Sequence, residues 1–163
     1  MTHMRRADRE VTSPDELSAI LDRASIGHLG VQDAGGVYVV PLHFGHEIGV
    51  DGVFRVYMHC AAGAGRKLDA IAANPRVCFE ADTFISLTGE SGPVCMLGAE
   101  FESVIGWGDA RVLADPTERR HGCAVLVDKF APGRGAELPL ELMRGVDIIE
   151  VRLETLSGKQ KRM

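Results

Sequence analysis

Apolar residues recur every three to four positions in the first regular segment of the chain. Between residues 14 and 24 this spacing is that of an α-helix with one buried face. Ser13 and Glu16 are spaced as a capping box, and Pro14 suits the first helical position. The residues before them are mostly polar. We therefore expect a helix over residues 14–24, preceded by a flexible arm over residues 1–12.

Several later segments alternate between apolar and polar residues, which is typical of β-strands with one buried face. Turn-forming residues separate them, such as the run at 33–36 and the Asp51-Gly52 pair. Because Pro41 cannot donate a backbone hydrogen bond, its strand is expected to lie at an edge or to bulge there. The predicted strands cover residues 26–32, 37–46, 53–59, 76–81, 100–113 and 147–153, of which 100–113 is either a strand pair or one bent strand.

Helical patterns and breaks fill the remaining chain. A helix is expected from about Arg66 to Asn74, another from Asp115 to about Phe130, and a short one around residues 140–144. Glycine and proline interrupt every period over residues 82–99, so this segment is expected to be mostly a loop insertion. About six strands with three peripheral helices indicate a mainly β (α+β) protein built on a small antiparallel barrel.

Composition and charge narrow the range of functions. The chain has 163 residues, of which 45% are apolar, and this length predicts one domain. The formal net charge of −5 disfavours nucleic acid or an acidic membrane surface as a partner. No apolar run approaches the ~20 residues that cross a bilayer, and no apolar region follows the N-terminal cations. We expect a cytoplasmic protein that binds neither nucleic acid nor membranes.

Metal binding is not expected. The cysteines are far apart and form no C-x-x-C pair, so free and mostly buried thiols are expected. His43 and His46 lie three residues apart on a predicted strand, where their side chains face opposite sides. The four cysteines are Cys60, Cys78, Cys95 and Cys123.

The most informative motif is a run of small residues at 61–65 that leads into Arg66 and Lys67. Small residues let the backbone approach a ligand, and a helix that begins at Arg66 offers unpaired amides with a partial positive charge. Cations at this helix end oppose the helix dipole by ~0.3–1 kcal/mol each, and a bound anion would remove the conflict. The motif therefore predicts a phosphate site, with a solvated first helical turn as the alternative.

Neither common nucleotide motif fits this loop. A Walker loop requires Ser or Thr after its lysine, whereas Lys67 is followed by Leu68. A dinucleotide fingerprint requires a third glycine, which is missing from the run Gly63-Ala64-Gly65-Arg66-Lys67-Leu68. We expect the ligand to be a mononucleotide or another phosphorylated small molecule.

The order YVVPLHFGH, VYMHCAAGAGRKLDAIAANPRVCFE and FESVIGWGDARVL resembles the FMN-binding split-barrel superfamily of pyridoxamine 5′-phosphate oxidase. The resemblance covers roughly residues 5–160. It implies a single FMN-binding domain over residues 1–163, folded as a six-stranded antiparallel split β-barrel with a basic tail over residues 154–163. It also implies a homodimer with FMN at the subunit interface.

The resemblance assigns roles to individual positions. Arg66 and Lys67 match the pair that holds the FMN phosphate. A histidine at the position of His59 and a Gly-Lys pair near the C-terminus, here Gly158-Lys159, are features of the nitroimidazole-reductase-like branch. The remaining implied cofactor-binding residues are Val40, Pro41 and Leu42 along the flavin ring, Tyr57, Met58 and His59 beneath it, Ser103 and Val104 beside it, and Lys159 from the tail.

The chain departs from true pyridoxamine phosphate oxidases at its end. It closes with LETLSGKQKRM and lacks their Arg-x-His and R-L-x-P segments, and its only tryptophan is Trp107. Trp107 is expected in the core or at a dimer contact. The resemblance therefore implies an FMN-dependent oxidoreductase that passes electrons to a small planar acceptor such as a nitro-aromatic. His59 is the candidate catalytic residue, or else a structural histidine.

Two alternatives remain open. One is a related oxidase of other specificity. The other is a non-catalytic flavin- or haem-binding module, in which His59 or His43 would be the axial haem ligand.

Overall fold

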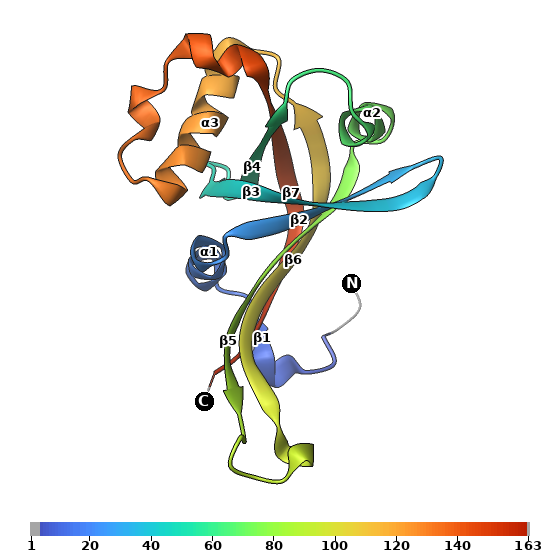
Figure 1. Ribbon diagram of the computed structural model, residues 1–163, viewed down its shortest axis with the longest axis vertical. Coiled ribbons are helices and arrows are strands. Elements are labelled where there is room, and N and C mark those ends of the chain that lie inside the picture. The colour runs from blue at the N-terminus through green and yellow to red at the C-terminus, as the bar shows by residue number, and fades with distance from the viewer. Residues whose placement is uncertain (1–3, 163) are drawn as a thin grey trace.

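Six long antiparallel strands pair into a closed ring (Figure 1). The computed structural model describes residues 4–162. The order around the ring is β7-β4-β3-β2-β5-β6, and β6 pairs again with β7. The strands are β2 (Ile26–Asp33), β3 (Gly36–Ile48), β4 (Phe54–Ala61), β5 (Arg76–Thr88), β6 (Gly98–Val112) and β7 (Val146–Lys161). This arrangement confirms the mainly β architecture and is consistent with a split barrel.

Along each strand, apolar side chains that point into the ring alternate with side chains that point outward. The inward side chains therefore form a hydrophobic core that fills the ring. Phe44 and Phe79 are fully buried, and their rings pack edge to face with centroids 5.2 Å apart. Helix α1 (Pro14–Arg23) adds Leu17, Ile20 and Leu21 to the same core. The helical period over residues 14–24 is therefore confirmed, with α1 ending at Arg23.

Two further helices flank the ring. Helix α2 (Arg66–Ala73) follows β4, and α3 (Pro116–Phe130) packs on β3, β4 and β7. Asp115 caps α3 by accepting hydrogen bonds from the Thr117 and Glu118 amides. A Cβ on Gly45 would lie 2.6 Å from the α3 backbone at Leu126, so this glycine permits the close approach of α3 to β3. None of the helices described within residues 4–162 is long and apolar enough to span a membrane.

The prediction of a loop insertion over residues 82–99 is wrong at both ends. Strand β5 continues to Thr88 and β6 begins at Gly98, so the two form a long projecting hairpin (Figure 1). The pairing shifts register between Phe84 and Ser86, which interrupts the alternation that marks a strand. Only the tip between the strands is loop, with a short 3₁₀ helix, η2 (Val94–Met96). Of the two alternatives for residues 100–113, the structure has one long strand with an irregularity at Trp107/Gly108.

The predicted arm and tail are also ordered where the structure describes them. The segment before α1 forms η1 (Ala7–Arg9) and β1 (Glu10–Val11), which pairs with β7. The tail belongs to β7, which runs to Lys161 along β6. The polar residues of the tail do not indicate a strand, because one face of this part of β7 is open to water. On the other face, Gly158 packs against Val11 and Leu17.

Smaller predictions were corrected as well. Ser13 precedes α1 but its side chain makes no capping hydrogen bond, so the capping box does not form. The segment expected as a short helix is 3₁₀, η4 (Leu140–Gly145), preceded by η3 (Gly135–Glu137). The cysteines form no disulfide among the described residues, but only Cys60 is buried.

Candidate functional site

The small-residue loop enters α2 as the sequence predicts, and it leaves that helix end free for an anion. Gly65 is the N-cap residue and supplies no capping side chain. Gly63 has a φ of 110°, a conformation that favours glycine, and its amide donates to Asp147 at 3.1 Å. A Cβ added at Gly63 or Gly65 would meet no atom within 4 Å, so the space beside the loop is open.

Arg66 and Lys67 differ in their surroundings. Arg66 pairs with Asp33, with Nε 2.6 Å from Oδ2 and Nη2 3.0 Å from Oδ1. The hydrogen bond from Arg66 lowers the pKa of Asp33, and the same bond raises the pKa of Arg66. Lys67 is half-buried and makes no hydrogen bond or ion pair within residues 4–162. Lys67 is therefore a cation without an anionic partner in the described chain, beside a helix end that no side chain caps.

His59 lies at the end of β4, directly before this loop, and its side chain is exposed. Within the described part of the chain it makes no hydrogen bond or ion pair. The neighbouring residues Tyr57 and Met58 are buried instead. Tyr57 donates to Glu47 at 2.8 Å, and burial together with this bond strongly raises the pKa of Tyr57. The side chains of Tyr57 and Met58 are thus committed to packing, and the main chain of both residues pairs with β3 on one side and with β7 on the other.

The predicted cofactor-binding residues of β3 also differ in how far their side chains are buried. Pro41 is exposed on the outer face of β3, while Val40 and Leu42 point inward and pack on the core. Pro41 pairs with His28 of β2, but β3 does not pair with β4 until Phe44. The missing proline donor therefore faces an unpaired edge, as expected.

A broad outer face of the ring is left uncovered by helices; we call it the open face. Two neighbouring rows of residues cross β3, β2, β5 and β6 here, and the apolar members Val39, Ile105 and Trp107 are 53%, 38% and 46% exposed. Trp107 is therefore not a core residue. The rows are Val39-Gly30-Cys78-Trp107 and Pro41-His28-Glu80-Ile105.

Ser103 and Lys159 share the next row with Asp82, because Ser103 pairs with both of them across the strands. Val104, the fourth predicted residue in this region, is fully buried. Lys159 is far from Arg66, which contacts Asp33 at the opposite end of β2. The eight residues of β2 place these cations more than roughly 20 Å apart along the strand. One chain therefore does not bring all of its predicted site residues together.

The open face also holds a cluster that sequence reasoning missed. His28 Nδ1 lies 2.9 Å from Glu80 Oε2, and possible ligand atoms of His28, Glu80 and Asp82 all lie within 4.8 Å of one another. Burial raises the pKa of Glu80, and the charge of Asp82 adds to this effect. The residues are up to 54 positions apart in the chain, and only the β2–β5 pairing reveals their contact.

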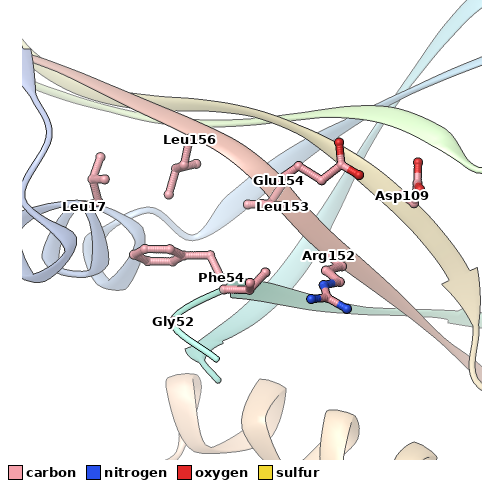
Figure 2. Close-up of a pocket in the computed structure, with 9 residues that line it drawn as sticks. Leu17, Gly52, Phe54, Asp109, Arg152, Leu153, Glu154 and Leu156 are labelled. Carbon is pink, nitrogen blue, oxygen red and sulfur yellow. The ribbon is translucent and has the colours of Figure 1, made fainter. Parts of the chain in front are cut away.

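Cavities open at several places on the ring, and Tyr57 lines one of about 310 Å³ together with Arg111 and His121. One of about 470 Å³ opens between α1, β4 and β7, with apolar Leu17, Phe54 and Leu156 on one side (Figure 2). Its charged side carries Asp109 and Glu154, which both pair with Arg76. The larger cavity contains none of the predicted site residues, and neither cavity is lined by Arg66, Lys67 or the loop before them, so this part of the candidate site is an open surface.

Comparisons with solved structures show the same fold in other proteins. The flavocytochrome Anf3 from Azotobacter vinelandii is 22% identical, with a TM-score of 0.80 over 99% of this chain and 73% of its own. A candidate 5-nitroimidazole antibiotic resistance protein from Bacteroides thetaiotaomicron is 20% identical, with a TM-score of 0.76 over 98% and 96%. An FAD- and haem-binding protein from Mycobacterium smegmatis is 20% identical, with a TM-score of 0.78 over 95% and 74%.

The comparison with sequence profiles of protein families identifies the family of the chain as well as its fold. No match was found among curated protein sequences. The sequence profile described as pyridoxamine 5′-phosphate oxidase matches residues 13–160, which is nearly the whole chain and includes the small-residue loop before α2. The chain therefore belongs to the pyridoxamine 5′-phosphate oxidase family.

Proposed function

We propose that this protein is an FMN-dependent oxidoreductase that passes electrons to a small planar acceptor such as a nitro-aromatic. The observation that carries the proposal is the uncapped start of α2, where Lys67 has no anionic partner in the described chain and the space beside the loop is open. An anion at this position would satisfy the amides, the helix dipole and the cations together.

The residues around the loop fit a flavin mononucleotide. The first amides of α2, with Arg66 and Lys67, would hold its phosphate. Pro41 and the adjoining main chain of β3 would support the flavin ring of FMN, since this part of β3 is exposed and does not pair with β4. Bound FMN would supply the redox chemistry, accepting a hydride and passing two electrons on. His59 would then orient the acceptor and donate a proton to it.

A second copy of the chain is part of this proposal. Lys159 and Ser103 lie too far from Arg66 to complete the same site within one chain. The open face exposes apolar side chains such as Val39 and Trp107, which is typical of a surface that another protein covers. A homodimer that buries the open face would bring Lys159 of one copy toward the loop of the other.

A haem-binding module is the second candidate, favoured by two proteins of similar fold, a flavocytochrome and an FAD- and haem-binding protein. His59 is exposed and free to act as an axial ligand. His43 is less suitable, because its Nδ1 lies 3.2 Å from the Ser25 carbonyl and its ring packs edge-on to Phe130. A related oxidase of other specificity has no comparable observation in its favour.

The visible spectrum of the purified protein separates these candidates. Flavin absorption without a Soret band supports the proposal, and a Soret band would favour the haem reading.

Arg66→Ala then tests the phosphate site. This substitution should weaken FMN by roughly tenfold to a hundredfold, because a charge-assisted bidentate contact contributes about 1.5–3 kcal/mol. Riboflavin lacks the phosphate and should bind with unchanged affinity. Equal losses for the two ligands, measured by calorimetry, would show that Arg66 is structural.

A further inference from the structure

The guanidinium of Arg66 is held on two sides by the β2–β3 hairpin. Its Nε and Nη2 donate to the two carboxylate oxygens of Asp33 at 2.6 and 3.0 Å. Its Cζ lies 4.6 Å from the centroid of the Tyr38 ring, so the cation stacks on an aromatic face. Arg66 is nevertheless about half exposed, at 51% for its side chain. The contacts hold the guanidinium plane without covering it.

Asp33 is itself fixed by the turn in which it lies. Its Oδ1 accepts a hydrogen bond from the Gly35 amide at 2.8 Å, which is an Asx turn. Asp33 pairs with Gly36 at the end of the β2–β3 ladder, and Gly36 has a φ of 106°. Tyr38 follows two residues later on β3. The tip of the hairpin thus presents an anchored carboxylate and an aromatic ring to the first residue of α2.

This contact leaves most of the donors of Arg66 available. A guanidinium carries five N–H groups, and Asp33 accepts from only two of them. Both N–H groups of Nη1 and one of Nη2 are free of hydrogen-bond partners among residues 4–162. These donors form the second edge of the fork, which can bind another anion while the first edge stays on Asp33.

We infer that Asp33 and Tyr38 are positioning residues that orient Arg66 to bind a phosphate monoester at the start of α2. The inference rests on the proposed function and goes beyond it by assigning the selection of a phosphorylated ligand to the β2–β3 turn. A long arginine side chain loses rotamer freedom when it binds a ligand. Because the hairpin already restricts Arg66, that loss occurs on folding instead of on binding.

Electrostatic repulsion opposes this positioning effect, and the balance between the two decides whether Asp33→Asn weakens or strengthens FMN binding. Asp33 is an anion near the expected phosphate, and its repulsion alone would weaken binding. The Asp33 side chain is partly exposed to solvent, at 23%, and water together with 0.15 M salt weakens this repulsion. Orientation should therefore dominate, and removing the carboxylate should weaken the phosphorylated ligand.

Calorimetry with FMN and with riboflavin at 0.15 M salt tests this inference. Asp33→Asn and Tyr38→Leu should each weaken FMN by about threefold to tenfold, as expected when one immobilised side chain is released. Riboflavin affinity should not change. In the Arg66→Ala background, Asp33→Asn should cause no further loss of FMN affinity, because its positioning effect acts through Arg66.

Asp51→Asn is the matched control. Asp51 also forms a bidentate pair, with Arg55 at 2.8 and 2.7 Å, and also accepts the amide two residues onward in a hairpin turn. It lies in the β3–β4 turn, away from the loop, and its substitution should leave both ligands unaffected.

The outcomes separate this inference from the proposed function. If Arg66→Ala weakens FMN selectively but Asp33→Asn does not, the phosphate site stands and the positioning role is wrong. Stronger FMN binding in Asp33→Asn would mean that Asp33 competes with the phosphate, which also overturns the inference. If the wild-type protein binds no FMN, or Arg66→Ala has no effect, the proposed function fails together with the inference.

Discussion

Exposure at the residue scale decides which predicted side chains are free to touch a ligand. Arg66 and His59 are exposed, and Lys67 is half-buried without a partner in the described chain. Tyr57 and Met58 occupy the interior, where removing them would leave a cavity. Substitutions at the exposed positions therefore report on ligand binding, whereas substitutions at the buried ones report first on stability.

His59→Ala should retain FMN while slowing the reoxidation of reduced flavin by a nitro-aromatic acceptor. The phosphate residues are untouched in this variant, but the proton donor is lost. General acid catalysis contributes ~10²–10⁴-fold, so stopped-flow absorbance should resolve the change.

His43→Ala serves as the comparison, because His43 is an exposed histidine held by Ser25 and Phe130. It should leave reoxidation unchanged. Loss of FMN from His59→Ala would instead make His59 a cofactor-binding residue, and normal reoxidation would make it structural.

At the scale of elements, one buried carboxylate joins the first helix to the last strand. Glu102 of β6 is fully buried and receives Arg23 of α1 at 2.5 and 2.8 Å. Arg162, just after β7, donates to the same carboxylate. Burial alone would raise the pKa of Glu102, but the hydrogen bonds from both arginines outweigh it and lower the pKa below its usual 4.5.

Glu102→Gln should lower the free energy of unfolding by about 1–2 kcal/mol at pH 7. The loss is small because both arginines are about half exposed and become hydrated when the charge is removed. Urea denaturation of the variant and the wild type measures the difference.

The pH dependence of that difference follows from the lowered pKa. A carboxylate with a depressed pKa stabilises the folded state above its unfolded pKa, and this stabilisation is lost as pH falls through the folded value. The gap between wild type and Glu102→Gln should therefore close below about pH 4.5. A gap of constant size down to pH 3 would contradict the role of the charge.

Elements with strong local signals could be predicted from the sequence, and those that depend on pairing could not. The apolar stripe of α1 and the loop before α2 are local patterns, and both are where they were expected. The second half of β5 was missed because a register shift breaks its alternation. The cluster of His28 and Glu80 was missed because sequence gives no register between β2 and β5.

At the scale of the whole molecule, the open face is the surface on which assembly and ligand binding would meet. Its apolar side chains lie in rows that cross four strands, close to Pro41 and to the row of Ser103 and Lys159. Because the strands of this face are hydrogen-bonded into a closed ring, a second copy could bury it without rearrangement of the sheet. Assembly and FMN binding should therefore depend on each other.

Trp107→Glu should weaken the homodimer and FMN binding together, since it places a charge on the apolar part of the open face. Multi-angle light scattering at micromolar concentration and FMN titration measure the two effects. Val50→Glu is the control, because Val50 is fully exposed in the β3–β4 turn and should change neither. A wild-type monomer that holds stoichiometric FMN would contradict the proposed interface.

The closure of the ring through β7 has a consequence for biosynthesis. Strand β7 pairs with both β4 and β6, and β1 pairs with β7 as well. On the ribosome, β4 and β6 therefore present unpaired edges until residues 146–161 have left the exit tunnel. Such edges are templates for pairing between chains. The nascent protein is most exposed to aggregation in the interval between the emergence of β6 and that of β7, when a chaperone would have its greatest effect on yield.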